Sequence, residues 1–208
     1  MLSLLFRLCE CVFRERDEHK IVRELSINDL KNHLCPTNHS DFVFLMPFGE
    51  PAVRAVIHEA KFHGNEKAWR LLGEILSDYL KHFPEESIVI PIPLSSTRLR
   101  QRGYNQVTEV AQRSGMTTSS KPPSSSLPRL RADLLYRKRD TTPQTSLTRQ
   151  ERLKNVTEAF GVRNQPDISG AHIIVLDDVA TTGATLKAAE ATLRPLRPAS
   201  ITLLALAH

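Results

Sequence analysis

The sequence predicts an α/β fold with a central, mainly parallel sheet flanked by helices, preceded by a small N-terminal appendage. From residue 42 onward, short runs rich in Val, Ile and Leu alternate with segments whose apolar residues recur at helical spacing. The clearest runs, HIIVL at 172–176 and SITLLALA at 200–207, are apolar almost throughout, as is typical of strands covered on both faces. With 208 residues, 40% of them hydrophobic, the chain is long enough for one substantial core.

We place a boundary between residues 41 and 42. Residues 1–41 mix charged and apolar residues without clear periodicity and contain all three cysteines, which indicates a degenerate appendage. Residues 42–208 form the predicted main domain.

The first half of this domain is predicted to begin with a strand and two helices. FVFLM at 42–46 is β-prone, Pro51 suits the first turn of a helix that Gly64 ends, and a second helix is expected over 66–82. SIVIPIPL at 87–94 then predicts a buried strand that gives way to a loop, because Pro91 and Pro93 cannot take part in a central ladder.

The second half alternates helices, loops and strands. A helical pattern runs from Tyr104 to Met116, and the Ser/Pro-rich stretch 117–128 is predicted to be a flexible loop because it holds too little apolar surface to order itself. Short strands are expected at 134–136 and 159–162, and Thr148 with Glu151 forms a capping-box pattern that opens a short helix. The strand at 172–176, a helix over 184–193 and a terminal strand at 200–207 complete the domain.

Two adjacent acids follow the predicted strand at 172–176. Asp177 and Asp178 stand side by side at its carboxyl end, where like charges repel unless hydroxyl groups or a cation compensate them. In open α/β sheets, ligands bind beyond the carboxyl ends of the strands. A ribose 2′,3′-diol supplies the hydroxyl groups that such a pair needs.

The turn after the acids has the features of a phosphate site. Its threonines offer hydroxyl groups, Gly183 lets the backbone approach an anion, and free N–H groups point outward where the turn leads into a helix. A Gly-x-x-x-x-Gly-Lys-[Ser/Thr] loop and a Gly-x-Gly-x-x-Gly after a strand are both lacking. A capped turn without a ligand would leave the acid pair unexplained, so we predict a ribose 5-phosphate site. Its predicted loop residues are Val179, Ala180, Thr181, Thr182, Gly183, Ala184 and Thr185.

The segment 173–185 resembles the phosphoribosyl-pyrophosphate motif of type I phosphoribosyltransferases, and nearly the whole chain from Phe42 onward resembles their ComF/GntX branch. VIPIPLSSTRLRQRGYNQ at 89–106, RKRDTTPQTSLTRQERLKNVTEAFGV at 137–162 and VIHEAKFHGNEKAWRLLGEIL at 56–76 are similar to signatures of that branch. The resemblance implies a type I phosphoribosyltransferase-like fold.

The resemblance also implies roles for particular residues. Asp177 and Asp178 would hold the ribose hydroxyl groups, as the catalytic acids of a pentosyl transfer. Residues 91–98 would approach pyrophosphate, and residues 137–152 would form a hood over the reaction centre. Mg²⁺ normally accompanies the substrate, 5-phosphoribosyl 1-pyrophosphate, and Asp177 and Asp178 are the candidate protein ligands of that ion.

Pyrophosphate also requires positive charge. Residues 98–163 contain 14 lysines and arginines against 5 acidic residues, and a concentrated positive region attracts polyanions. Each of these side chains has an ordinary alternative as a solvated surface charge. The candidates for pyrophosphate and the hood are Arg98, Arg100, Arg102, Lys138 and Arg139.

A zinc site is not favoured. Members of the ComF branch usually begin with a four-cysteine zinc finger, but here Cys9 and Cys11 are too close for a knuckle. A retained site would have to combine them with Cys35 and His39 at unusual spacing. The three cysteines suit a reducing cytoplasm, and we expect no membrane segment because no apolar stretch approaches the ~20 residues that a spanning helix needs.

Two functions remain open at this point. The first is phosphoribosyl transfer to an acceptor that the sequence does not identify. The alternative is a non-catalytic ComF-type accessory protein in DNA uptake, whose basic region contacts single-stranded DNA or a competence helicase. The type I resemblance also makes a homodimer an expectation.

Overall fold

The computed structural model describes residues 16–118, 127–138, 159–163 and 168–208, and every structural statement below concerns these ranges. Its centre is a six-stranded sheet in the order β1-β2-β8-β7-β3-β4. All neighbours pair in parallel except β1 with β2, which confirms the predicted, mainly parallel sheet. The strands of this sheet are β1 (Thr37–His39), β2 (Phe42–Met46), β3 (Ile88–Pro91), β4 (Arg129–Leu130), β7 (His172–Val179) and β8 (Ser200–Ala207).

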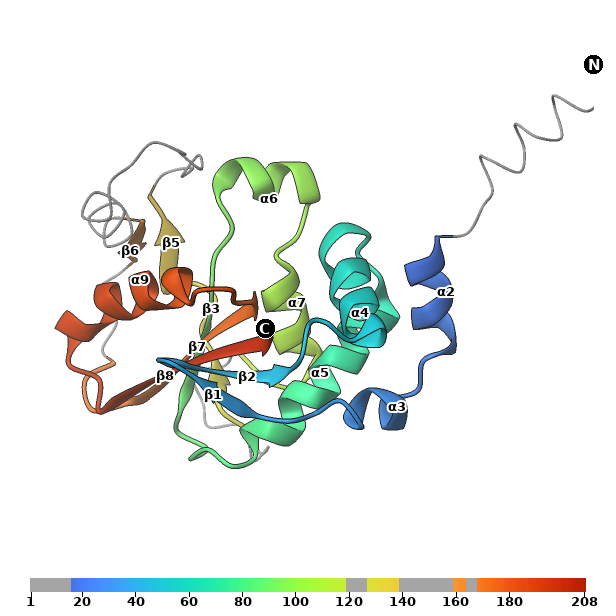
Figure 1. Cartoon of the computed structure of the whole chain (residues 1–208). Helices are drawn as coiled ribbons and strands as arrows, with labels where there is room; N and C mark the ends of the chain where they lie inside the picture. Colours follow the sequence, from blue (N-terminus) through green and yellow to red (C-terminus); the bar gives the residue numbers. More distant parts are fainter. Residues whose placement is uncertain (1–15, 119–126, 139–158, 164–167) are drawn as a thin grey trace, which may run out of the picture.

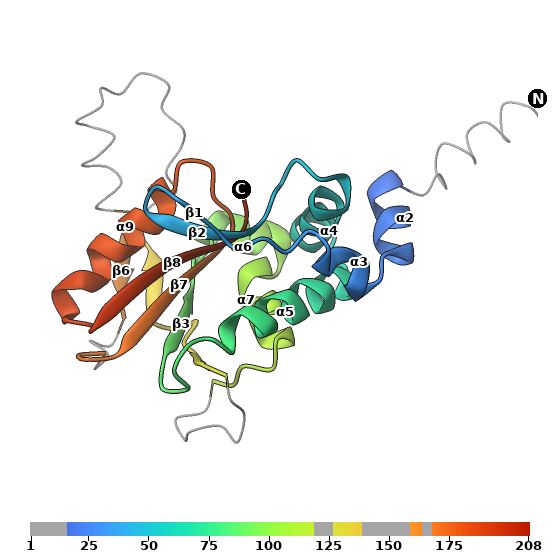
Figure 2. The same ribbon diagram turned by 60° about the horizontal axis from the view of Figure 1, so that its bottom comes forward.

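Helices cover both faces of the sheet (Figures 1 and 2). The helices are α2 (Asp17–Glu24), α3 (Ile27–Lys31), α4 (Pro51–Phe62), α5 (Glu66–Leu80), α6 (Ser96–Arg102), α7 (Gln106–Arg113), α9 (Ala184–Leu193) and the 3₁₀ turn η1 (Arg194–Leu196). A separate antiparallel pair consists of β5 (Leu135–Arg137) and β6 (Phe160–Val162).

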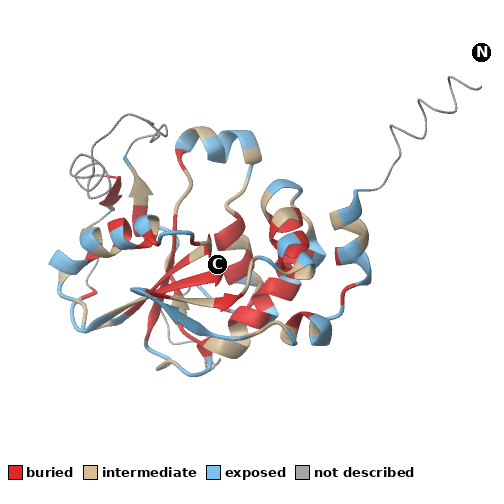
Figure 3. Ribbon diagram, viewed as in Figure 1, coloured by how far each residue is buried: buried red, intermediate tan, exposed pale blue. Residues whose placement is uncertain are grey.

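The alternation of side chains along each strand divides the interior into two cores. Ile174 and Leu176 of β7 pack with α4, α5 and α7 in one core, whereas Ile173 and Val175 pack with α9 and β6 in the other. The central strands are therefore buried on both sides (Figure 3), which explains why their sequences are continuous apolar runs.

Most predicted elements are present with nearly the predicted bounds, including α9 and β8. The prediction for Pro91 was wrong, because it lies in β3 opposite Leu176. Ile92 donates its N–H to Leu176 of β7, so the ring of Pro91 faces the other side, where β4 pairs only with Ile88 and Val89 and needs no donor from Pro91. The helices α2, α3 and α6 and the short edge strands β1 and β4 were not predicted.

The N-terminal segment is packed onto the main domain where it is described. α2 and α3 lie beside α4 and α5 (Figure 1), and Val22 and Leu30 are fully buried in the same core as α5. β1 extends the sheet as its antiparallel edge. The boundary between residues 41 and 42 stays a prediction.

The connections that follow β3 and β7 lead to opposite faces of the sheet. β3 is followed by α6 and α7, and α7 contributes to the core with α4 and α5, whereas β7 is followed by α9 on the other face. Since β3 and β7 are neighbours, a crevice opens between their carboxyl ends, the position at which open α/β sheets bind ligands.

Some predictions fall on other parts of the chain. The predicted helix that begins near Thr148 and most of the predicted loop 117–128 lie outside the described residues. In the described ranges, no helix is long and apolar enough to cross a membrane.

Candidate functional site

The two predicted acids lie at the end of β7 and belong to different sides of the sheet. The strand runs to Val179, three residues beyond the predicted HIIVL, so its alternation continues through Asp177 and Asp178. Asp178 follows Ile174 and Leu176 toward α4 and α7, whereas Asp177 follows Ile173 and Val175 toward the turn before α9. At the open strand end both acids line one cavity.

Asp178 is held by three donors. Its Oδ1 accepts a hydrogen bond from the Val179 N–H at 2.9 Å. Its Oδ2 accepts from Gln106 Nε2 at 2.8 Å and forms an ion pair with Lys61 Nζ at 2.9 Å. With a side chain only 8% exposed, Asp178 is a buried carboxylate whose charge is compensated by groups from α4 and α7.

Asp177 has a different environment. Its Oδ1 accepts a hydrogen bond from the Asp178 N–H at 2.9 Å, and Asp177 lines both this cavity and the hollow of the turn that follows β7. Asp177 therefore faces the space in which a ligand would lie.

The electrostatics separate the two carboxyl groups further. Burial and the neighbouring charge of Asp178 raise the pKa of Asp177 to about 8. Burial also acts to raise the pKa of Asp178, but the Lys61 ammonium and the hydrogen bonds from Lys61 and Gln106 outweigh it and keep that pKa below its ordinary value. The negative charge of the pair is therefore favoured on Asp178 and disfavoured on Asp177.

The turn after β7 forms a small anion cradle. Residues 179–186 with Asp177 line a hollow of about 60 Å³. Gly183, with φ +70°, is the N-cap of α9 and provides no side-chain cap. The Ala184 N–H donates to Thr182 Oγ1 at 3.4 Å, and the next N–H groups of the first helical turn are left for a ligand. A Cβ at Gly183 would lie 2.7 Å from the Phe42 ring, which explains why glycine is needed there.

The end of β8 and His208 contact the backbone of this turn. Ala180 donates its N–H to the carbonyl of Ala207 at 3.1 Å, and Nδ1 of His208 lies 2.8 Å from the Ala180 carbonyl oxygen. The His208 ring also packs against Phe42 and Phe44. These contacts fix the backbone of the cradle at Ala180, while its hollow stays open to a ligand.

A second cavity, of about 170 Å³, adjoins the cradle on the other side of Asp177. It collects positive charge from three separate segments and shares Asp177, Val179 and Thr185 with the cradle. Its cationic lining residues are Lys61, Arg98, Arg102 and Arg137.

The structure brings only some of the predicted cations to this cavity. Arg98 and Arg102 are one helical turn apart on α6 and both line it, whereas Arg100 lies on another side of the helix. Lys138 is exposed and is not a lining residue, and Arg139 lies outside the described residues.

Lys61 and Gln106 were missed as site residues. Both lie in segments that carry the family resemblance, but nothing in their local spacing shows that they meet Asp178. Arg102 Nη1 donates to Gln106 Oε1 at 2.8 Å, and Tyr104 donates its hydroxyl to the Lys61 carbonyl at 3.2 Å. The network that supports Asp178 is therefore itself anchored.

The donor set at the acids suits Mg²⁺ only in part. Carboxylate oxygens are the ligands that Mg²⁺ prefers, and two of them line the cavity. Within the described residues, however, no group of three or more His, Cys, Asp or Glu side chains is placed to hold a metal ion. The acids therefore fit an ion that completes its coordination with ligand oxygens and water. For the zinc prediction, Cys35 is a free, exposed thiol, while Cys9 and Cys11 lie outside the described ranges.

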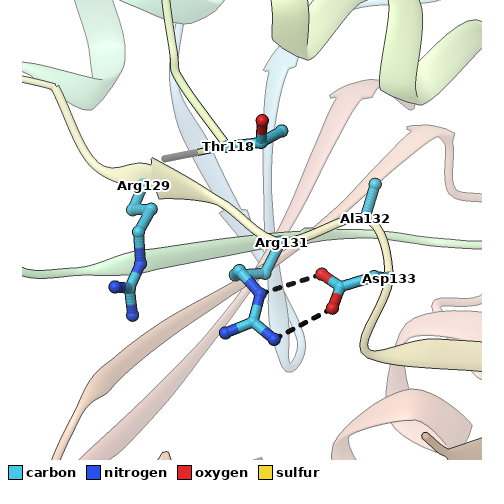
Figure 4. Close-up of a pocket in the computed structure, with 5 residues that line it drawn as sticks. All are labelled: Thr118, Arg129, Arg131, Ala132 and Asp133. Atoms are coloured by element: carbon cyan, nitrogen blue, oxygen red, sulfur yellow. Dashed lines mark hydrogen bonds and ion pairs between the residues drawn. The ribbon is translucent and has the colours of Figure 1, made fainter. Parts of the chain in front are cut away.

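A larger hollow, of about 480 Å³, lies at the β4 edge of the sheet and contains none of the predicted site residues. There Arg131 donates two hydrogen bonds to Asp133, at 2.8 and 2.9 Å (Figure 4). Because the charge of Arg131 is already compensated, we place the candidate ligand site at the acids and not in this hollow.

Comparison with known proteins agrees with this fold. Residues 71–208 match the family model described as phosphoribosyl transferase domain. The chain is 29% identical to the competence protein ComFC of Bacillus subtilis over 86% of this chain and 68% of that protein. It is 30% identical to ComFC of Streptococcus pneumoniae over 65% of this chain and 54% of that protein. It is 27% identical to the DNA utilization protein YhgH of Escherichia coli K12 over 65% of this chain and 58% of that protein.

The chain belongs to the phosphoribosyl transferase domain family, since the family model covers more than half of it. Similarity to the ComFC and YhgH proteins confirms the resemblance to the ComF branch, and kinship with GntX stays a prediction. The matches span little more than half of the S. pneumoniae and E. coli relatives.

Proposed function

We propose that this protein binds 5-phosphoribosyl 1-pyrophosphate, or a related ribose 5-phosphate, together with Mg²⁺, and transfers the phosphoribosyl group to an acceptor. One observation carries this proposal. The anion cradle, the acid pair and the cationic cavity adjoin one another and share Asp177, Val179 and Thr185. That order matches the 5-phosphate, the ribose hydroxyl groups and the pyrophosphate of this ligand.

Each part has a task in the proposed reaction. The bond between ribose C1 and the pyrophosphate oxygen breaks with its electron pair on pyrophosphate, and C1 bonds to the acceptor. The four cations of the cavity stabilise the negative charge that develops on the leaving group, while the cradle and the acids hold the sugar in position. When bound, Mg²⁺ supplies a Lewis acid that polarises the pyrophosphate oxygens.

Isothermal titration with 5-phosphoribosyl 1-pyrophosphate and Mg²⁺ tests the binding step. We expect wild type to bind and the double variant Asp177→Asn/Asp178→Asn to lose binding. Asp78→Asn, which alters an acid on α5, serves as the control and should bind like wild type. If wild type does not bind, the proposal fails. Release of pyrophosphate in the presence of nucleobases or amines tests the transfer step.

A second candidate function is a non-catalytic accessory role in DNA uptake, which the names of the ComFC and YhgH relatives favour. The structure contributes one observation. The Phe62 ring is 52% exposed and lies beside Lys61 and Arg102, which line the cationic cavity. An exposed ring beside cations is the arrangement on which single-stranded DNA stacks its bases.

A gel shift with single-stranded DNA at two salt concentrations tests this second candidate. We expect wild type to bind less tightly at the higher concentration, because phosphate contacts weaken with salt, and Phe62→Ala to bind more weakly at both. Equal binding by wild type and Phe62→Ala would leave a helicase partner as the remaining form of the accessory role.

A further inference from the structure

Lys61 occupies the place beside the acid pair that a metal ion would need. It lies in the last turn of α4, and its Nζ is 2.9 Å from Asp178 Oδ2. A divalent cation that bound the same oxygen would lie within a few ångströms of the ammonium. Like charges this close repel strongly at the effective dielectric of a protein surface, so the two cations compete.

Most carboxylate oxygens of the acid pair already accept hydrogen bonds, so they are poor ligands for a cation that binds without a sugar phosphate. Asp178 Oδ1 and Asp177 Oδ1 each accept a backbone N–H at 2.9 Å, and Gln106 donates to Asp178 Oδ2. Among the residues that the structure describes, no third acid, histidine or cysteine joins the pair as a metal ligand. Mg²⁺ requires near-octahedral coordination by oxygen, which this pair does not supply by itself.

The position of Lys61 is fixed by its surroundings. Tyr104 holds the Lys61 carbonyl, and the lysine side chain is only 28% exposed. Gln106, the other side-chain donor to Asp178, is itself held by Arg102. Lys61 therefore has a defined place between Asp178 and the cavity that Arg98, Arg102 and Arg137 line.

We propose that Lys61 is a built-in counter-ion that keeps a bare divalent cation out of the acid pair, so that the metal enters only with a diphosphate-bearing sugar. The ligand's phosphate oxygens then supply both the missing metal ligands and a new partner for the Lys61 ammonium. Lys61 acts through Asp178 and is thus a positioning residue. This inference rests on the proposed function for the identity of the sugar, but its main consequence concerns the metal alone.

Titration of Mn²⁺ alone into the full chain, followed by the electron paramagnetic resonance signal of the free ion, tests the proposal. We expect wild type to bind Mn²⁺ at least about tenfold more weakly than Lys61→Gln, a difference of roughly 1.4 kcal/mol. Arg98→Gln removes a charge from the same cavity but keeps the ion pair of Lys61 with Asp178, so it should bind Mn²⁺ alone as weakly as wild type. Lys61→Arg keeps the positive charge beside Asp178 and should bind Mn²⁺ alone equally weakly.

Two results would overturn the inference. One is tight binding of Mn²⁺ alone by wild type, which decides the matter even where Lys61→Gln does not fold. The other is equal Mn²⁺ binding by Lys61→Gln and Arg98→Gln, which would assign the effect to the general field of the cavity. No sugar is present in this titration, so its failure is distinguishable from a failure of wild type to bind 5-phosphoribosyl 1-pyrophosphate.

Discussion

Glu59 and Asp178 are two buried carboxylates with nearly the same kind of partners. Glu59 accepts hydrogen bonds from Arg16 Nε at 3.2 Å and from Asn65 Nδ2 at 2.9 Å, and Asp178 has a lysine and a glutamine in the same roles. In the described part of the chain, however, Glu59 has no second acid beside it in this network, and it joins the N-cap of α2 to the turn between α4 and α5. Asp178 adjoins Asp177 and an open cavity.

The comparison shows that a buried, compensated acid does not by itself mark a ligand site. What distinguishes Asp178 is its neighbour. Among the residues that the structure describes, Asp177 forms no ion pair, and its pKa is raised, so the fold maintains an unfavourable group where a ligand would relieve it. Such perturbed groups cluster at functional sites.

The largest expected effect is on stability at Glu59. Its side chain is fully buried, so Glu59→Ala leaves Arg16 and Asn65 without their acceptor. We expect a loss of about 3 kcal/mol in the free energy of unfolding, the lower end for a broken buried pair, because the Arg16 side chain is half exposed. Denaturant unfolding measures it. Ligand affinity should stay unchanged, and a loss of affinity in the folded variant would contradict a purely structural role.

Asp178→Ala should affect ligand affinity more than stability. Asp178→Ala leaves the buried Gln106 amide without its acceptor, but it also removes the repulsion with Asp177, and the partly exposed Lys61 can regain water. The loss of stability should therefore be smaller than at Glu59, about 1 kcal/mol. Affinity for 5-phosphoribosyl 1-pyrophosphate with Mg²⁺ should fall at least about tenfold. Unfolding and calorimetric titration on one preparation measure both. If Asp178→Ala destabilises the protein as strongly as Glu59→Ala, the two acids do not differ in role.

The two networks should also respond to pH with opposite sign. The folded-state pKa of Asp177 is raised from 3.8 to about 8, so its contribution to stability is lost as the pH rises between these values. For Glu59, burial is outweighed by Asn65 and Arg16 and the pKa is lowered, so its contribution is lost as the pH falls. Asp177→Asn should therefore gain stability over wild type as the pH rises toward 8. A constant difference across that range would contradict the assignment.

The smallest expected effect is at Asp78, a partly exposed acid with two lysine partners. It accepts from Lys31 Nζ at 2.7 Å and Lys81 Nζ at 2.9 Å, but its side chain is 35% exposed. Because exposed ion pairs contribute little, Asp78→Asn should cost less than about 1 kcal/mol in thermal or denaturant unfolding. A cost equal to that of Glu59→Ala would show that the number of cations, and not burial, sets the contribution of each acid.

The amino-acid sequence by itself determined the features that lie within one continuous segment. The apolar runs of β7 and β8, the acids after them, the glycine turn and the start of α9 follow from local patterns, because strand alternation, turn chemistry and helix N-termini depend on neighbouring residues. The fold class follows from the order of such segments.

Only the tertiary structure decided which acid faces the cradle and the cavity and what compensates the other. Gln106 and Asp178 are separated by 72 positions along the chain, and Lys61 comes from yet another helix. The register between β3 and β7 and the packing of α4 and α7 bring them together. Arg98 and Arg102 reach the cavity whereas Arg100 does not, because α6 forms where a loop was predicted. These outcomes depend on contacts between distant segments, and no local pattern contains them.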